Sequence, residues 1–484
     1  MMLKHTKIVA TISDQRCEIE FIDRLHKAGM DVVRLNTAHL QEEGLARIVN
    51  NTRAVSDRIG ILVDTKGPEV RTTITQEPVD FKSGDRVKMT GDPDGTTTRD
   101  CICVSYESFV KDLEVGSDIL IDDGDLELKV IEKTAGYLVC EAQNDATLGS
   151  RKSVNVPGVR INLPSLTAKD RKNIAWAIEN KIDFIAHSFV RSKQDVLDIQ
   201  EILDAHGSPI KIIAKIENQE GVDNIDDILK AAYGIMIARG DLGIEVPAEK
   251  IPGLQRVLIR KCVEAKKPVI VATQMLHTMI KNPRPTRAEV TDVANAIYYR
   301  TDALMLSGET AYGKYPVEAV QTMSKIIGEA EKTKLSANDI RVPISGDDLD
   351  VTSFLAKQAV KSSSKLNVRA IISDSMTGRT ARYLAAFRGK ATVFAICYRK
   401  ETMRMLSLSY GVWAVYQPWL KSRRSYYYEA LRLLIESGKI TEKDKVAYLS
   451  GSFGEGGGTT FLEINDVERV LNAGDRYQLP TFSD

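Results

Sequence analysis

The sequence has no excess of charge of either sign. Its 484 residues include 66 Lys and Arg against 66 Asp and Glu, so the formal net charge is zero. Proteins that bind nucleic acid or an anionic membrane surface through charge carry a basic excess. We therefore expect neither partner, and any cationic site on this chain has to be local.

Cysteine and histidine are scarce, and neither forms a metal-binding pattern. Among the six cysteines the only close pair is Cys101-Ile102-Cys103, which lacks the spacing of a zinc site or of a CxxC redox motif. We interpret the thiols as reduced and mostly structural, as is usual in a reducing compartment. Four scattered histidines without zinc spacing are interpreted as structural or surface residues, namely His39, His187, His206 and His277.

Long apolar runs are missing. The opening MMLKHTKIVATIS has too short an apolar run for a signal peptide. No stretch reaches the roughly 18 apolar residues of a membrane span. These absences predict a cytoplasmic protein. The hydrophobic fraction of 43% is ample for large cores, and the length suggests roughly three domains at about 150 residues each.

The stretch from Ile210 to Gly243 shows how the main core is built. Two apolar runs of strand length, IKIIAKIE and GIMIARGD, both end in charged residues. Between them, Val222–Ala232 has apolar residues at helical spacing. A strand, a helix and a strand in this order predict two parallel strands.

The same alternation recurs until eight strands are counted, the number in a (β/α)8 TIM barrel. After the third strand, from about Arg71 to Val159, short alternating runs with Gly, Asp and Pro turns predict a small all-β domain. The predicted barrel strands are 7–12, 31–36, 61–65, 183–189, 210–217, 234–239, 268–274 and 303–308.

The remaining chain predicts a smaller open α/β domain. A polar segment at 335–346 is interpreted as a linker, and helices and strands alternate again beyond it. The predicted organisation is a first barrel part (1–68), a small β-barrel domain (69–163), a second barrel part (164–335) and a C-terminal α/β domain (347–484).

Polar side chains follow most of the predicted barrel strands, where the active sites of such barrels lie. Lys215 and Glu217 are two residues apart, so in a strand they face the same side. Glu217 and Asp241, after the next strand, form a carboxylate pair that suits Mg²⁺, and Lys215 suits a migrating phosphoryl group or an enolate oxygen. Arg34 suits phosphate, and Arg239 binds phosphate or holds a carboxylate in place. The alternative is a set of ion pairs on a solvated rim.

Other strand ends leave alternatives open. Thr273 offers a hydroxyl to a ligand or makes a strand-end hydrogen bond. Free N–H groups near Gly240-Asp241 would attract a carboxylate. Asn36, Asp64 and Thr65 offer hard oxygens for a second cation, although Asp64 is nearly as well explained as a structural acid.

One more candidate lies between a strand and a helix of the last domain. Hydroxyl and N–H groups at a helix start can hold phosphate, but an ordinary capped loop explains the same residues. They are Ser373, Asp374, Ser375, Met376, Thr377, Gly378, Arg379 and Thr380.

Several longer segments resemble the pyruvate kinase family. They include DTKGPEVRT, KIENQEGV, GIMIARGDLGIEVPAEK, NPRPTRAEVTDVANA and LMLSGETAYGKYPVEAV. The resemblance covers the barrel, the β domain and, more weakly, the C-terminal domain. It implies the last step of glycolysis, in which the phosphoryl group of phosphoenolpyruvate moves to ADP to give pyruvate and ATP. It also implies Mg²⁺ (or Mn²⁺), K⁺ and a homotetramer.

By matching position, the resemblance implies a role for each residue at the barrel mouth. Arg34 resembles the residue that contacts the substrate phosphate, and Lys215 resembles the lysine that bridges the transferred group and stabilises the enolate. Thr273, with the backbone of Gly240 and Asp241, resembles the site for the substrate carboxylate. The implied Mg²⁺ ligands are Glu217 and Asp241, and the implied helpers in protonating the enolate carbon through water are Thr273 and Ser307.

The resemblance also implies the surrounding sites. Asn36, Asp64 and Thr65 resemble the K⁺ ligands. Arg71 and Lys152 resemble nucleotide-phosphate contacts, and the β domain then acts as a lid over the barrel mouth. The 373–380 loop resembles an effector-phosphate loop, and the identity of any sugar phosphate stays open.

Two departures from the family pattern bear on these roles. The family's N-F-S-H reads Asn36-Thr37-Ala38-His39, so a serine K⁺ ligand is missing at Ala38. Glu69 resembles the form that accompanies K⁺ dependence, and we therefore still predict K⁺ activation. The usual T-I-G-P reads TISD at residues 11–14, a change expected on the nucleotide side.

Two alternatives of other classes remain at this point. A catalytically silent sensor would bind phosphoenolpyruvate or a sugar phosphate, but it has no need of the Mg²⁺ pair. An enolase-like or aldolase-like lyase would use no nucleotide lid, so a dependence on ADP separates it from a kinase.

Overall fold

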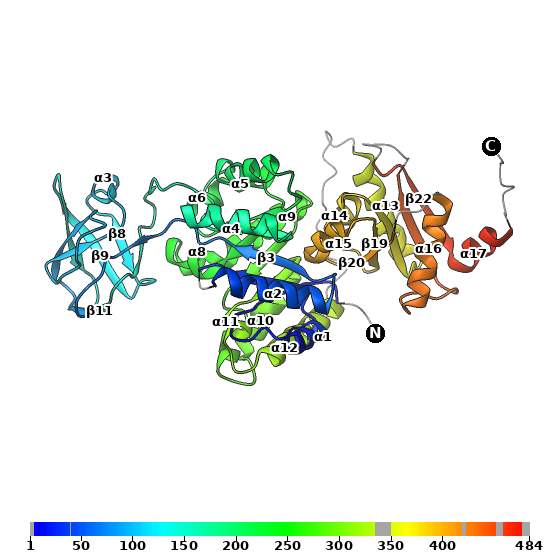
Figure 1. The fold of residues 1–484 in the computed structure, drawn as a ribbon, viewed down its shortest axis with the longest axis horizontal. Helices are drawn as coiled ribbons and strands as arrows, with labels where there is room; N and C mark the ends of the chain where they lie inside the picture. Colours follow the sequence, from blue (N-terminus) through cyan, green and yellow to red (C-terminus); the bar gives the residue numbers. More distant parts are fainter. Residues whose placement is uncertain (1–3, 39, 334–349, 419–422, 452–457, 477–484) are drawn as a thin grey trace.

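The computed structural model describes residues 4–38, 40–333, 350–418, 423–451 and 458–476, so the linker predicted at 335–346 and His39 lie outside the described residues. Three parts follow one another along the long axis of the molecule (Figure 1). An all-β part lies at one end, an α/β barrel lies in the centre, and a second α/β part lies at the other end. No helix in the described ranges is long and apolar enough to cross a membrane.

The central part is a closed barrel of eight strands, which confirms the predicted interrupted (β/α)8 barrel. The order around the barrel is β1-β17-β16-β15-β14-β13-β3-β2, and all neighbouring strands are parallel. The strands are β1 (Lys7–Thr11), β2 (Val32–Asn36), β3 (Gly60–Asp64), β13 (Phe184–His187), β14 (Lys211–Ile216), β15 (Gly234–Ala238), β16 (Val269–Ala272) and β17 (Ala303–Leu306).

The barrel strands read as apolar runs because both of their faces are buried. One set of side chains, including Val9, Leu62 and Ile213, fills the interior. The alternate set, including Ile8 and Ile61, packs against the helices outside. The interior is therefore a packed core, and polar groups are left for the strand ends.

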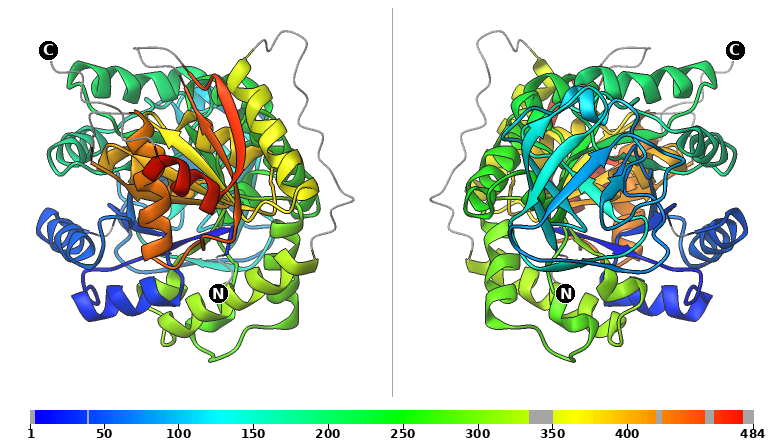
Figure 2. Two further views of the ribbon diagram at one scale, coloured as in Figure 1. Left: turned by 90° about the vertical axis from the view of Figure 1, so that its right-hand side faces the viewer. Right: turned by 90° about the vertical axis from the view of Figure 1, so that its left-hand side faces the viewer.

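Helices surround the barrel strands (Figure 2). Three of them begin with a capping box, in which a Ser or Thr and an acid three residues later satisfy each other's backbone N–H groups. The helices are α1 (Ile19–Ala28), α2 (Glu42–Val55), α4 (Ala168–Glu179), α5 (Lys193–Ala205), α9 (Ile251–Glu264), α10 (Arg287–Tyr298), α11 (Gly308–Ala311) and α12 (Pro316–Thr333).

The single helix predicted over Val222–Ala232 is wrong, because the chain forms α6 (Gln219–Asp223) and α7 (Ile225–Ala231) with a break at Asn224. Asn224 has non-helical backbone angles, and its side chain donates to the carbonyl of Arg191 at 2.9 Å. The bond holds Asn224 against the loop that follows β13, between the two short helices. A short helix, α8 (Arg239–Glu245), follows β15 directly.

The inserted part is all-β, as expected. Seven strands form one sheet in the order β4-β12-β8-β9-β10-β6-β7, and β11 pairs with β5. A bridge between Thr72 and Val104 joins the two edges of the sheet, which wraps around its own apolar core. The elements are β4 (Val70–Arg71), β5 (Val79–Phe81), β6 (Arg86–Thr90), β7 (Cys101–Cys103), α3 (Phe109–Asp112), β8 (Asp118–Ile121), β9 (Leu126–Lys133), β10 (Leu138–Ala142), β11 (Ala146–Leu148) and β12 (Ser153–Asn155).

The C-terminal part is an open five-stranded sheet in the order β20-β19-β18-β21-β22, with β22 antiparallel to β21. The exact domain limits stay a prediction. The elements are α13 (Val351–Lys365), β18 (Ala370–Ser375), α14 (Arg379–Ala386), β19 (Thr392–Cys397), α15 (Lys400–Met405), β20 (Val412–Tyr416), α16 (Arg423–Glu436), β21 (Lys445–Ser450), β22 (Phe461–Asp466) and α17 (Val467–Arg476).

Buried ion pairs join the C-terminal part to the strand starts of the barrel. Asp302, just before β17, accepts hydrogen bonds from Arg388 at 3.1 and 2.6 Å and from the backbone N–H groups of Val269 and Tyr410. Asp302 and Arg388 are only 4% and 1% exposed. Breaking such a pair leaves a buried charge without its partner.

We expect Arg388→Met to lower the free energy of unfolding by about 3–5 kcal/mol, because Asp302 stays buried and loses its charged partner. Lys400→Met is a matched control across the same interface. Lys400 pairs with Asp57 at 2.5 Å, but both side chains are about half exposed, so the loss should be at most about 1 kcal/mol. Urea denaturation followed by circular dichroism measures both, and equal losses would contradict the assignment.

Candidate functional site

Charged side chains from three strand ends meet at one mouth of the barrel. Arg34 on β2 donates from Nε to Asp64 Oδ2 on β3 at 2.9 Å, and its Nη2 makes a further short contact with the same oxygen. Lys215 Nζ on β14 lies 3.4 Å from Asp64 Oδ1 and 2.8 Å from Glu217 Oε1. Asp64 therefore joins two cations from different strands, and the predicted convergence of these side chains is what the structure shows.

Burial and neighbouring charges set the ionisation of this group. Burial opposes ionisation of Asp64, but Lys215 and Arg34 outweigh it and hold the pKa of this carboxyl below its ordinary value. Burial likewise opposes the charge on Lys215, while Asp64, Glu217 and Asp241 together raise its pKa. For Glu217, burial raises the pKa to about 7; Lys215 opposes this rise and Asp241 adds to it. Near neutral pH, Glu217 is thus the group poised to gain or lose a proton.

Neighbouring hydroxyl and N–H groups hold the charged side chains in place. Ser188 Oγ accepts from Lys215 Nζ at 2.9 Å and donates to the carbonyl of Thr65 at 2.7 Å. Thr11 Oγ1 accepts from Arg34 Nη1 at 3.2 Å and donates to a carbonyl at the end of β17. The roles of Thr11 and of the Phe189 N–H, which donates to Glu217 Oε2 at 2.7 Å, were missed from the sequence. Thr11 is the last residue of β1, so its place at a strand end was a usable signal.

Thr273 lies at the same mouth in a strained backbone conformation. Its φ is 67°, which is exceptional for a β-branched residue and costs on the order of 1–3 kcal/mol. Arg239 donates to the Thr273 carbonyl at 2.6 Å and to both oxygens of Asp292 at 2.8 and 2.7 Å. Thr273 Oγ1 accepts from the Gly240 N–H at 2.8 Å. Arg239 therefore holds the Asp292 carboxylate and the Thr273 backbone in place. Of the two roles expected for Arg239, phosphate binding and holding a carboxylate, these contacts match the second.

The three residues proposed for a second cation lie side by side. Asn36 and Asp64 are register partners on β2 and β3, and Thr65 follows Asp64. Asp64 Oδ1 is buried and accepts no hydrogen bond within the described residues. Asn36 Oδ1 accepts from the Ala38 N–H at 3.1 Å. A carboxylate oxygen that faces Lys215 and lacks a hydrogen bond fits a cation next to it.

Ser307 follows β17, which lies between β1 and β16 in the barrel. Its N–H donates to Glu309 Oε2 at 2.8 Å, and Glu309 Oε1 accepts from the Leu276 N–H at 3.1 Å. Glu309 is 2% exposed. Both oxygens of this acid are thus used to fix backbone, so Glu309, although at a strand end, is a structural group.

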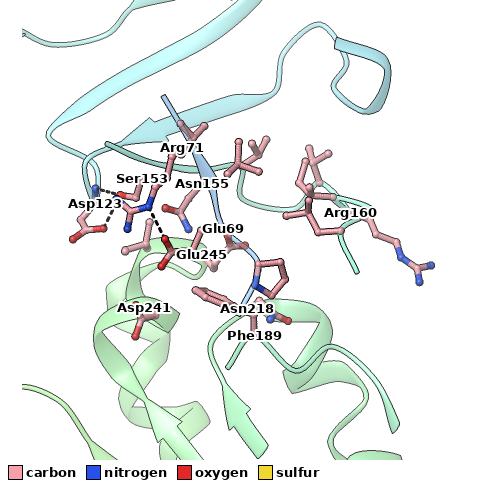
Figure 3. Close-up of a pocket in the computed structure, with 18 of the residues that line it drawn as sticks. Glu69, Arg71, Asp123, Ser153, Asn155, Arg160, Phe189, Asn218, Asp241 and Glu245 are labelled. Atoms are coloured by element: carbon pink, nitrogen blue, oxygen red, sulfur yellow. Dashed lines mark hydrogen bonds and ion pairs between the residues drawn. The ribbon is translucent and has the colours of Figure 1, made fainter. Parts of the chain in front are cut away.

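A cleft of about 800 Å³ separates the barrel mouth from the all-β part (Figure 3). Arg71 and Lys152 line it from the all-β side, and Asp241 lines it from the barrel side. Arg71 Nε lies 2.6 Å from Glu69 Oε2, and Lys152 Nζ lies 2.5 Å from Asp122 Oδ2. Lys215 and Glu217 do not line this cleft, whereas Asp241 does.

The loop predicted to hold phosphate joins β18 to α14. Ser375 Oγ is buried and makes no hydrogen bond within the described residues. Arg379 Nη2 donates to Asp350 Oδ2 at 2.7 Å, and Thr380 Oγ1 lies 2.6 Å from Thr459 Oγ1. Gly378 has a φ of 78°, where side chains are rarely tolerated. Ser373 makes only a long contact, 3.5 Å, to the next carbonyl.

A metal at Glu217 and Asp241 would need ligands from outside the protein. Within the described residues, no group of three or more His, Cys, Asp or Glu side chains is arranged to hold a metal ion. Mg²⁺ commonly takes one or two carboxylates and leaves its other positions to water and substrate phosphate. The donor set therefore fits Mg²⁺ and does not fit a structural zinc site.

Comparison with known proteins covers nearly the whole chain. Residues 3–320 match the family model described as pyruvate kinase, barrel domain, and residues 354–465 match pyruvate kinase, alpha/beta domain. The pyruvate kinase of Borreliella burgdorferi is 46% identical over 480 residues, covering 97% of this chain and 99% of the relative. That of Bacillus licheniformis is 43% identical over 486 residues, covering 98% and 82%. A crystal structure of a pyruvate kinase from Cryptosporidium parvum matches with a TM-score of 0.91 at 36% identity, covering 96% of each chain.

The raised pKa of Glu217 predicts how stability changes with pH in metal-free buffer. The folded protein keeps a proton on Glu217 up to about pH 7, whereas the unfolded chain releases it near pH 4.5. Stability should therefore fall as pH rises between these values, by on the order of 3 kcal/mol. Glu217→Gln removes this contribution, so its denaturation midpoint should fall less between pH 5 and pH 8 than that of the wild type.

The exposed Glu179→Gln is the control for this comparison and should follow the wild type at each pH. Urea titrations in EDTA at several pH values give the three curves. If Glu217→Gln and the wild type lose stability in parallel, Glu217 is ionised in the folded protein at pH 5 and the electrostatic description of the site is wrong.

Proposed function

The chain belongs to the pyruvate kinase family and is a phosphotransferase, and we propose that it catalyses the last step of glycolysis in the cytoplasm. The bond from phosphorus to the enol oxygen of phosphoenolpyruvate breaks, and a bond from phosphorus to a β-phosphate oxygen of ADP forms. A proton adds to the enolate carbon, giving pyruvate and ATP. The observation that carries this proposal is the group formed by Arg34, Asp64, Lys215 and Glu217 at one barrel mouth.

Arg34 and Lys215 bind the phosphoryl group and stabilise the enolate oxygen in this proposal. Asp64 contacts both cations and raises the pKa of Lys215, so both remain charged while buried. Phosphoryl transfer is accelerated mainly by positioning and by charge neutralisation. A preorganised donor of this kind accounts for about 10²–10³ in rate, or roughly 3–4 kcal/mol.

Glu217 and Asp241 would hold Mg²⁺ (or Mn²⁺), which when bound neutralises charge on the phosphoryl oxygens. The pKa of Glu217, raised to about 7 by burial and Asp241, supports the assignment. It identifies two acids that are close together with too little positive charge around them. Lys215 alone does not satisfy this pair, because it also faces Asp64.

The substrate carboxylate is proposed to lie against Thr273 and the backbone of Gly240 and Asp241. Arg239 supports this arrangement by fixing the Thr273 carbonyl. Ser307 follows the strand next to β16, which ends beside Thr273. Thr273 and Ser307 are therefore proposed to orient the water that delivers a proton to the enolate carbon.

Asn36, Asp64 and Thr65 would hold K⁺, and this is supported by Asp64 Oδ1, which accepts no hydrogen bond from any described residue. Arg71 and Lys152 would bind the phosphates of ADP or ATP from the lid side of the cleft. Both cations are paired with carboxylates in the structure, so nucleotide binding would exchange these partners for phosphate oxygens.

The 373–380 loop is proposed to bind the phosphate of a sugar-phosphate effector. The unpaired Ser375 Oγ supports this proposal. Asp374 lies in the same segment, but its carboxylate already accepts hydrogen bonds from Tyr398, Tyr448 and Ser450. These bonds stabilise its negative charge and weaken its repulsion of a phosphate in the loop. A homotetramer and the lack of a nucleic-acid partner complete the proposal.

We predict that Lys215→Met lowers turnover at least about 10²–10³-fold, because a buried donor to the transferred group is lost. Pyruvate formation from phosphoenolpyruvate and ADP, coupled to lactate dehydrogenase, measures the rate. The exposed Lys169→Met on α4 is the control and should retain the wild-type rate. A Lys215→Met protein that is folded by circular dichroism and turns over normally would remove the role assigned to Lys215.

We predict that Ala38→Ser lowers the half-activating K⁺ concentration severalfold, because it adds a hydroxyl oxygen beside Asn36. Ala38→Cys is the matched control, since it adds an atom of similar size that K⁺ does not favour. The same coupled assay with K⁺ replaced stepwise by tetramethylammonium gives both values. Equal K⁺ dependence in the serine variant and the wild type would place the cation elsewhere.

A further inference from the structure

Cations gather between the barrel and the C-terminal part without enough carboxylates to pair them. Lys267, just before β16, and Arg382, on α14, line one small cavity together with the Arg388–Asp302 pair. Asp302 is already used by Arg388 and by two backbone N–H groups. Lys211, the first residue of β14, lies close enough to Arg382 to feel its charge.

Lys266 and Arg388 also line the cavity, and Arg388 is paired with Asp302. Neither Lys267 nor Arg382 has an acidic partner in the described part of the chain. The guanidinium of Arg382 lies 4.9 Å from the centre of the Tyr233 ring, and its buried Nε makes no hydrogen bond to any described residue. Lys267 Nζ donates to the carbonyl of Ala232 at 2.5 Å. The Tyr233 ring and the Ala232 carbonyl interact favourably with the two cations. Neither group carries a negative charge that would neutralise Arg382 or Lys267.

The charges of this cluster repel one another across the interface. Burial, followed by Arg382, lowers the pKa of Lys267 to about 8. The same two causes, in the same order, lower the pKa of Lys211, with Asp204 opposing them. An anion held between the two parts would remove this repulsion and restore full charge to both lysines.

We propose that Lys267 and Arg382 form an anion site for a phosphate group, supplied by inorganic phosphate or by a small phosphorylated metabolite. A planar guanidinium and an ammonium group are the cations that proteins use to bind phosphate oxygens. The cavity measures about 10 Å³, room for roughly one water-sized atom. One phosphate oxygen therefore enters it, and the rest of the group stays at its open side.

The position of the site connects two functional regions. Lys267 lies just before β16, which leads directly to Thr273. Arg382 lies on α14, which begins where the 373–380 loop ends. The site is separate from that loop, because Lys267 comes from the barrel. A bound phosphate group would thus tie the C-terminal part to the strand that leads to Thr273.

The test is thermal unfolding of the full chain in rising inorganic phosphate, with sodium chloride keeping the ionic strength constant. We expect phosphate to raise the Tm of the wild type, and Arg382→Met and Lys267→Met to lose most of this rise. In chloride alone, both variants should be at least as stable as the wild type, because one repelling charge is gone. Lys365→Met, an exposed cation at the end of α13, is the control and should keep the full response.

Phosphate that binds at the barrel mouth or at the 373–380 loop should raise the Tm of the wild type and of the variants equally, because those residues are unchanged. An arm with glycerol phosphate separates the two sources. If glycerol phosphate raises the Tm more than inorganic phosphate does at equal concentration, the ligand is a phosphorylated metabolite. If it raises the Tm less, the ligand is free phosphate. The proposal is overturned if both variants keep the wild-type response, if Lys365→Met loses it equally, or if chloride alone produces the same rise.

Discussion

The barrel mouth depends on one buried carboxylate that two cations share. Asp64 contacts Arg34 on one side and Lys215 on the other, and its side chain is 2% exposed while each cation is 11% exposed. A buried cation without an ionised partner would lose its proton or destabilise the fold. In the proposed function, Asp64 thereby keeps two positive charges available for an anionic substrate. Because Lys215 also pairs with Asp64, it offsets only part of the rise in the pKa of Glu217, which stays high.

The closed barrel brings these groups together, and hydroxyl groups then fix them. Asp64 ends β3, and Lys215 lies near the end of β14, with β13 between them. Ser188, just after β13, bridges the gap by contacting both Lys215 and Thr65. Arg239 does a similar task at Thr273, where its bonds stabilise a backbone conformation that threonine otherwise avoids. The residues at the barrel mouth are thus held in place by hydrogen bonds from neighbouring side chains.

Much of the fold could be predicted because the barrel repeats a short pattern. The strand predicted at 210–217 is Lys211–Ile216, and its apolar run marks it clearly. The convergence of Arg34, Lys215 and Glu217 followed from the rule that strand ends share one mouth. Contacts that follow no repeating sequence pattern could not be predicted from the sequence. The bond from Arg404 to Asp183 joins residues 221 apart, the break at Asn224 depends on a distant carbonyl, and the φ of Thr273 depends on Arg239.

The central claim is that acids from neighbouring strands share one divalent cation beside Lys215. Diffraction from crystals of the full chain grown with Mn²⁺ and measured at the manganese edge tests it most directly. The account predicts one anomalous peak bonded to carboxylate oxygens of both Glu217 and Asp241. Density at only one of the two acids, or side chains turned into separate cavities with no shared peak, would contradict it.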